Sequence, residues 1–152
     1  MIKVLVHGSG GKMGGHVMAE IAKSGDMELF CGVDPKSQGP ENYKYYDSFD
    51  KVEGKPDVII DFSSPQLLND LLDYAKTNKT PLVIGTTGYS QEQENQIIKA
   101  LNGIYENLNE NEINFIKSLY PEIIQARYNF INNILSTCVT FQEDYIYGYH
   151  AT

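Results

Sequence analysis

The fold is decided by the stretch Ile2-Lys3-Val4-Leu5-Val6-His7-Gly8-Ser9-Gly10-Gly11-Lys12-Met13-Gly14. Residues 2–6 are mostly apolar and predict a buried strand, and a glycine-dense turn then leads into a helical pattern. Glycines let backbone N–H groups come close to a phosphate, and the positive end of the following helix dipole points to the same place. Ordinary tight turns also collect glycine, but the strand directly before this one favours nucleotide binding.

The composition is that of one globular domain. The chain has 152 residues, of which 41% are hydrophobic and 21% are charged, a balance typical of soluble proteins. No apolar run is long enough to cross a bilayer and no secretory signal precedes the first strand, so we expect a cytoplasmic protein. The net charge of −8 argues against nucleic acid or an anionic membrane as the partner. Cys31 and Cys138 lack metal-ligand spacing, and we expect two reduced thiols and no metal site.

Strands and helices alternate along residues 1–100. We predict strands at 2–6, 28–33, 57–62 and 82–84, with a short edge strand at Tyr45-Tyr46. We predict helices from Met13 to about Lys23, from Ser64-Pro65 to about 78, and from Ser90 to about Ala100. Gly25 is expected to end the first helix in the left-handed conformation. This alternation predicts an α/β fold, a doubly wound parallel sheet with helices on both faces.

Residues 101–152 are expected to form a helical tail rather than a continuation of the alternating pattern. Apolar residues repeat at helical spacing over 113–120 and 123–138, which predicts two further helices. Covering the sheet is the simplest role for such stripes. A stripe of this length could also form a contact between copies of the chain, so a homo-oligomer stays open.

Three loops follow the carboxyl ends of strands, where a doubly wound sheet binds its ligands. The first is the glycine turn, with Gly8, Gly11 and Gly14. The second contains Asp34, twenty residues past Gly14, where an acid would accept hydrogen bonds from the ribose hydroxyls of adenosine. The alternative for Asp34 is a turn residue before Pro35.

The third region combines Phe62-Ser63 with Gly85-Thr86-Thr87-Gly88 and would line the middle of the cleft. Its glycines would admit a flat ring and its hydroxyls would donate to that ring, although such a loop could also be a plain strand-to-helix connection. Lys12 and Lys36 bear on cofactor choice, because they could neutralise a 2′-phosphate that a carboxylate at position 34 disfavours. The alternative for both lysines, favoured for Lys36, is a solvated surface charge. The sequence therefore permits both NADH and NADPH.

Together these segments resemble dihydrodipicolinate reductase, also called 4-hydroxy-tetrahydrodipicolinate reductase, an NAD(P)H-dependent oxidoreductase family of lysine biosynthesis through diaminopimelate. The resemblance covers about residues 1–100 and is carried by 8–14, 32–34, 57–65 and 83–88. It implies a Rossmann-like NAD(P)-binding domain over 1–100. It also implies that the cofactor contacts Gly8, Gly11, Lys12, Met13 and Gly14 at the pyrophosphate, Asp34 at the ribose, and Phe62, Gly85, Thr86, Thr87 and Gly88 near the nicotinamide.

The tail departs from that family. The family continues into a substrate-binding and tetramer-forming domain with paired histidines, a nearby lysine and an Asp-Ala-Pro-Ser-Gly-Thr stretch, and none of these follows Lys99. His150 is the one histidine of the tail, and we assign no catalytic residue. A small-molecule substrate is expected only where a substrate domain is supplied. Three readings stay open: a reductase or its cofactor-binding part, a dinucleotide-binding module whose tail contacts a partner, and a folded fragment without function.

Overall fold

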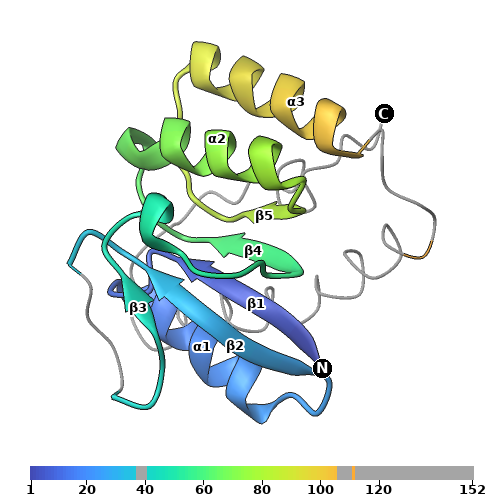
Figure 1. Ribbon diagram of the computed structural model, residues 1–152. Coiled ribbons are helices and arrows are strands. Elements are labelled where there is room, and N and C mark those ends of the chain that lie inside the picture. The colour runs from blue at the N-terminus through green and yellow to red at the C-terminus, as the bar shows by residue number, and fades with distance from the viewer. Residues whose placement is uncertain (37–40, 106–110, 112–152) are drawn as a thin grey trace.

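The computed structural model describes residues 1–36, 41–105 and 111, which form a five-stranded sheet with helices on both faces (Figure 1). The elements are β1 (Ile2–His7), α1 (Lys12–Lys23), β2 (Met27–Val33), β3 (Tyr45–Tyr46), η1 (Phe49–Lys51), β4 (Val58–Asp61), η2 (Pro65–Leu67), α2 (Leu68–Asn78), β5 (Leu82–Ile84) and α3 (Gln91–Tyr105). The strand order is β3-β2-β1-β4-β5 and every pairing is parallel. The predicted Rossmann-like α/β fold is confirmed, whereas the tail helices predicted over 113–120 and 123–138 lie outside the described residues.

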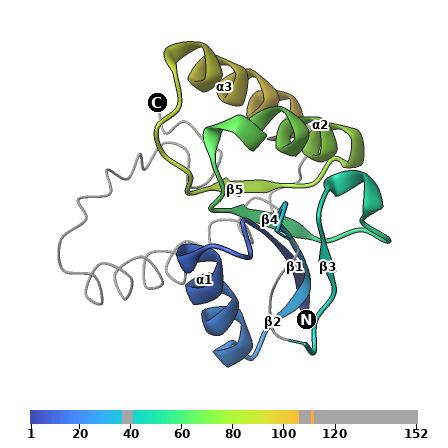
Figure 2. The same cartoon turned by 90° about the vertical axis from the view of Figure 1, so that its left-hand side faces the viewer.

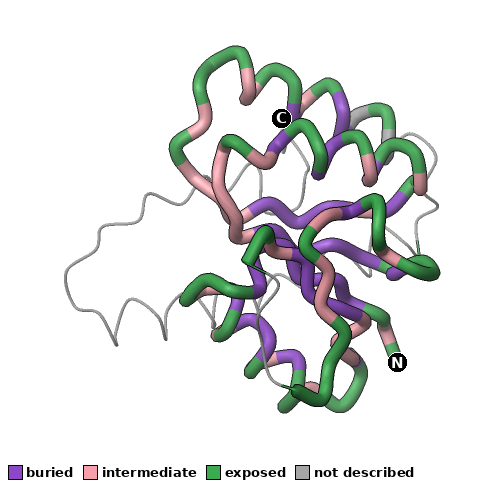
Figure 3. The backbone as a smooth tube through the Cα atoms, turned by 60° about the vertical axis from the view of Figure 1, so that its left-hand side comes forward, coloured by how far each residue is buried: buried purple, intermediate pink, exposed green. Residues whose placement is uncertain are grey.

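Each central strand contributes side chains to two separate hydrophobic layers. Val4 and Val6 of β1 pack with the α1 side, while Leu5 between them packs with α2 and α3. β4 and β5 alternate in the same way, because successive side chains of a strand point to opposite faces. Figure 2 shows α1 on one face of the sheet and α2 with α3 on the other. Burial on both faces explains why these strands are almost entirely apolar, and Figure 3 shows buried residues concentrated in them.

β2 departs from simple alternation. Its register against β1 shifts between Val4 and Leu5, so that Val4 pairs with Leu29 and Leu5 pairs with Cys31. Phe30 is thus the extra residue of a bulge. Leu29 packs with the α1 layer, whereas Cys31, two residues later, belongs to the α2 and α3 layer. The bulge therefore exchanges the two faces of β2 halfway along the strand.

Helix termini agree with the sequence in some places and differ in others. Ser90 and Gln93 form the predicted capping box at the start of α3: Ser90 N–H donates to Gln93 Oε1 at 3.0 Å, and Gln93 N–H donates to Ser90 Oγ at 3.2 Å. The left-handed Gly25 was a wrong prediction, because Ser24 ends α1 in an extended conformation and Gly25 has no positive φ. α3 also continues five residues past Ala100, to Tyr105, because Leu101 still packs into the core.

Among the described residues, no helix is long and apolar enough to cross a membrane. The described residues also contain no group of three or more His, Cys, Asp or Glu residues that could hold a metal ion.

Cys31 is predicted to be chemically inert in the folded protein. Its side chain is buried in the core, and burial raises the pKa of the thiol to about 12. Because the thiolate is the reactive species, iodoacetamide at pH 8 should leave Cys31 unmodified, and raising the pH toward 12 should increase its reactivity. Mass spectrometry of the tryptic peptide 24–36 would measure this. Full alkylation in guanidinium is the positive control, and equal alkylation without denaturant would contradict the buried position.

Candidate functional site

A pocket lies at the carboxyl edge of the sheet, where strand order reverses between β1 and β4. The chain leaves β1 toward β2 on one side and reaches β4 on the other, and this switch point is where open α/β sheets bind ligands. The pocket has a volume of about 250 Å³. Its lining comes from the loops after β1, β2 and β4: Gly8, Gly11, Asp34, Pro35, Lys36, Phe62, Ser63, Ser64 and Leu67.

The glycine turn is shaped by close backbone contacts. Gly8 has a backbone φ of +84°, which residues other than glycine rarely adopt. A Cβ at this position would collide with the carbonyl of Phe62. Gly14 lies in the first turn of α1, and a Cβ on it would collide with the carbonyl of Gly8. Because these two residues have no Cβ, β1, α1 and the loop after β4 can lie in contact. Gly14 does not line the pocket.

The start of α1 is open to a ligand. Gly11 is the N-cap residue, and no side chain caps the first-turn N–H groups. Those groups normally require a side chain, water or ligand as acceptor. Lys12 and Met13 follow in the same turn, Lys12 exposed and Met13 half-buried. The bare helix terminus with its dipole suits an anion.

Asp34 joins the loop after β2 to the glycine turn. Its Oδ2 accepts a hydrogen bond from the Gly10 N–H at 3.0 Å, and its Oδ1 accepts one from the Lys36 N–H at 2.8 Å. The second bond is an Asx turn, so Asp34 is a turn residue as well as a pocket residue. Each carboxylate oxygen keeps a second acceptor site. Asp34 can therefore still accept from hydroxyls of a ligand.

The Gly85–Gly88 loop lies beside the pocket and does not line it. A Cβ on Gly85 would collide with the ring of Phe62, so this glycine makes room for a pocket residue. The Ser63 N–H donates to Thr86 Oγ1 at 2.8 Å, which ties the loop after β5 to the loop after β4. Thr87 is half-buried, and Gly88 has φ of +87°.

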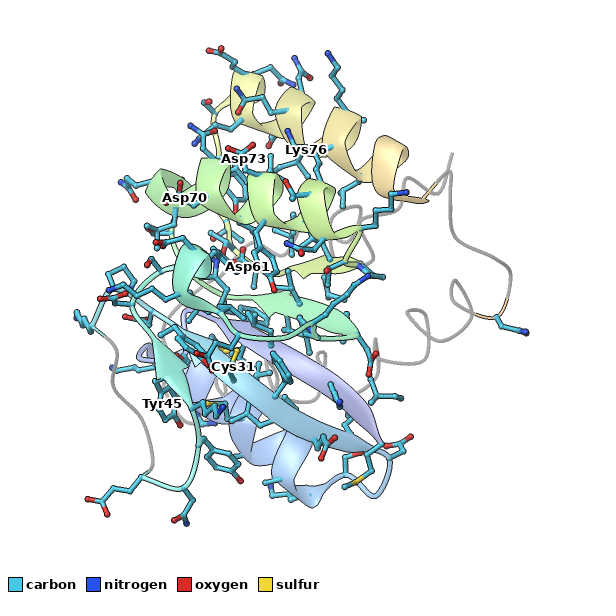
Figure 4. The ribbon with its side chains drawn as sticks, viewed as in Figure 1. Cys31, Tyr45, Asp61, Asp70, Asp73 and Lys76 are labelled. Carbon is cyan, nitrogen blue, oxygen red and sulfur yellow. The ribbon has the colours of Figure 1, made fainter. Side chains whose placement is uncertain are left out.

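A buried polar cluster beneath these loops is centred on Asp61, the last residue of β4. Its carboxylate has no exposed surface and is surrounded by four donor groups: His7 Nδ1 at 2.8 Å and Ser63 Oγ at 2.6 Å on Oδ1, and Thr86 Oγ1 at 2.7 Å and Tyr89 OH at 3.5 Å on Oδ2. Figure 4 shows Asp61 between the sheet and α2. The hydroxyls donate to the Asp61 carboxylate. The His7 ring packs against the ring of Phe49, with 4.7 Å between the ring centroids.

The pKa of Tyr89 is affected by its burial in this cluster. Burial of its phenol raises its pKa above the usual range, and the negative charge of Asp61 raises it further. The phenol therefore stays protonated, a state in which it donates a hydrogen bond to the Asp61 carboxylate. All four neighbours of the carboxylate act as donors, as a buried charge requires.

The structure brings only part of the predicted set together. Gly8, Gly11, Asp34 and Phe62 line the pocket; Lys12, Met13 and Gly14 follow it in α1; and Gly85, Thr86, Thr87 and Gly88 lie behind it. Asp61, Tyr89 and His7 are not among the site residues predicted from the sequence. One feature of the sequence could have identified Asp61: it is a charged residue at the end of an otherwise apolar strand, and a buried charge requires donors around it.

A larger pocket, of about 590 Å³, lies between α2 and α3. It is lined by Leu72 and Ala100 together with polar residues that include Lys76, Lys79 and Lys99. No strand-end loop contributes to it. The switch-point pocket is the better candidate because backbone turns, a helix terminus and a carboxylate converge there.

Comparison with known proteins identifies the family. The family model described as "Dihydrodipicolinate reductase, N-terminus" matches residues 2–107. A 4-hydroxy-tetrahydrodipicolinate reductase of Clostridium novyi is 34% identical over 97 residues, covering 64% of this chain and 38% of that protein. The enzyme of Clostridium tetani is 33% identical over 127 residues, covering 81% of this chain and 49% of that protein. The chain thus spans less than half the length of these curated relatives.

Among solved structures, a dipicolinate-bound dihydrodipicolinate reductase from Paenisporosarcina is similar, with a TM-score of 0.59 and 26% identity. The match covers 68% of this chain and 44% of that one. Fold, motifs and the family match agree over the same residues. The chain belongs to the dihydrodipicolinate reductase family, and residues 2–107 correspond to the N-terminal domain of that family.

Proposed function

We propose that this chain binds NADH or NADPH across the carboxyl edge of its sheet. The observation that carries the proposal is the convergence of the glycine turn, the uncapped start of α1 and Asp34 at one switch-point pocket. The adenosine half would lie toward β2 and the nicotinamide half over β4 and β5, because Asp34 follows β2 and Phe62 follows β4. The bound dinucleotide would supply a hydride.

Each group of pocket residues has a physical task in this proposal. The N–H groups at the start of α1 bind the pyrophosphate, and Gly11 lets it approach because no side chain intervenes. Asp34 accepts from the ribose hydroxyls with its remaining acceptor sites. The side chains of Lys12 and Lys36 are exposed, and we propose that they add positive charge near the phosphates.

We further propose that the chain acts as the cofactor-binding part of a 4-hydroxy-tetrahydrodipicolinate reductase in lysine biosynthesis. The named relatives carry that activity, and this chain spans less than half their length. Reduction of a small carboxylated substrate requires groups that bind it and a proton donor. We assign no residue of the described ranges to those tasks. The alternative is a dinucleotide-binding module without catalysis.

Titration with NADH and NADPH tests the proposal directly. The fluorescence of the reduced nicotinamide should change to saturation as protein is added, and ADP-ribose should compete. Turnover of 4-hydroxy-tetrahydrodipicolinate by this chain alone is expected to be absent. Failure to bind either nucleotide would refute the cofactor assignment, whereas turnover would mean that the chain also holds a substrate site.

Gly11→Val should abolish measurable NADH binding, because the new side chain would fill the phosphate approach. Gly11 has φ of −86°, which valine accepts, so the loss should not come from backbone strain. Gly15→Val is the matched control: it lies in α1, four residues after Gly11, and a Cβ there meets nothing within 4 Å. Unchanged affinity in Gly11→Val would overturn the phosphate-loop assignment.

Asp34 and Lys36 should affect cofactor selectivity in opposite directions. Asp34→Asn removes a negative charge from the pocket and should lower the ratio of Kd for NADPH to Kd for NADH by about tenfold, the size of one partly screened charge contact. Lys36→Gln should raise that ratio. Asp57→Asn is the control, since Asp57 also accepts from a backbone amide, Lys3 N–H at 2.8 Å, but precedes β4 at the opposite edge. Equal ratios in all variants would contradict a ribose site at Asp34.

A further inference from the structure

We propose that Asp61 is a positioning residue for the nicotinamide half of the dinucleotide site. Its carboxylate would hold the loop after β4 and the loop after β5 in one fixed relation. This inference rests on the proposed function, because the two loops matter only where a dinucleotide lies across β4 and β5. Asp61 itself is fully buried and does not line the pocket. It acts through residues that do.

Asp61 is linked to the pocket through Ser63. Ser63 lines the pocket, and its hydroxyl donates to Asp61 Oδ1 at 2.6 Å. Its backbone N–H donates to Thr86 Oγ1 at 2.8 Å. The hydroxyl and the backbone N–H of Ser63 are thus both bonded within the buried cluster. These two bonds fix the part of the pocket wall next to Phe62.

The hydroxyl of Thr86 is bonded on both sides within the protein. This hydroxyl donates its one proton to Asp61 Oδ2 at 2.7 Å and accepts from Ser63 N–H. A hydroxyl has a single donor hydrogen, so Thr86 has none left to donate to a ligand. From the sequence, the hydroxyls of this loop were expected to donate to a flat ring. In this arrangement Thr86 supports binding through the position of its loop.

Asp61 is itself anchored to the strands on both sides of β4. His7 ends β1 and pairs in register with Asp61 at the end of β4, so the bond at 2.8 Å joins neighbouring strands. The Gly85 N–H donates to the carbonyl of Asp61 at 2.8 Å, which attaches the start of the β5 loop. Side chain and backbone of one residue therefore connect three strand ends.

Replacing the Asp61 carboxylate would remove acceptors for the hydrogen bonds that connect these loops. Asparagine has the same shape, but its NH₂ group is a donor and would face two of the four donors now around Asp61. Unpaired buried donors are costly, so the loops would shift to re-pair them. The adenosine side would be spared, because Asp34 is bonded to Gly10 and Lys36 and not to this cluster.

The test compares NADH with ADP-ribose, which lacks the nicotinamide ring. Asp61→Asn and Thr86→Val should each raise the Kd for NADH about tenfold and leave the Kd for ADP-ribose within about twofold, the size expected for losing bonds to a charged group. Thr86→Val keeps the shape and loses only the hydroxyl, so it serves if Asp61→Asn does not fold. Thr86→Ser, which restores the hydroxyl, should recover most of the affinity.

Amide hydrogen exchange of the Ser63 N–H gives a readout that needs no ligand. Exchange should accelerate in Thr86→Val and return toward the wild-type rate in Thr86→Ser. Ser90→Ala is the matched control: it removes the cap of α3 and should lower Tm without changing the ratio of the two Kd values.

The outcomes separate this inference from the proposed function. Wild-type protein that binds none of NADH, NADPH and ADP-ribose refutes the function and this inference with it. Wild-type binding combined with an unchanged NADH affinity in folded Thr86→Val refutes the positioning role alone. Equal losses for NADH and ADP-ribose also refute it, because they indicate a general effect on the fold.

Discussion

A carboxylate without exposed surface lies at the carboxyl edge of the sheet, and donors from the surrounding strands and loops satisfy it. The Asp61 carboxylate is fully buried, and a buried carboxylate is tolerated only among donors. Donors come from β1, from the loop after β4 and from the loop after β5. The parallel sheet makes this possible, since it brings His7 and Asp61 together at the same edge. Loops that would otherwise be free connections are thereby held in one geometry.

A second constraint is the distance between backbones at the switch point. Gly8, Gly14 and Gly85 each lie where a Cβ would collide with the protein itself. Gly8 and Gly14 approach carbonyl groups, while Gly85 makes room for the ring of Phe62. Their lack of side chains is therefore needed for the fold before any cofactor is considered. Gly11 differs, because its Cβ would make only a tight contact, at 3.3 Å, and it faces the pocket.

Apolar periodicity predicted most of the fold. The strand Leu82–Ile84 has the predicted bounds, and the capping box at Ser90 forms as its residues indicate. The candidate site was predicted less completely. Asp34 and Gly11 follow from the spacing of a dinucleotide motif, whereas the role of Thr86 depends on a bond to a residue 25 positions away. Such a bond depends on three-dimensional packing, which periodicity does not encode. The end of α3 was missed for the same reason, since Leu101 is held by the core.

The bulge at Phe30 has a consequence for how this domain can change in evolution. Gly32 packs against Ser9, and Asp34 bonds the glycine turn, because residues 31–33 pair in register with residues 5–7 of β1. Phe30 belongs to neither register segment, since Val4 pairs with Leu29 and Leu5 pairs with Cys31. Removing this one residue would therefore leave both segments and the position of Asp34 in place. The bulge is thus the point at which β2 can change its length by one residue, whereas an insertion within either segment would shift that segment against β1.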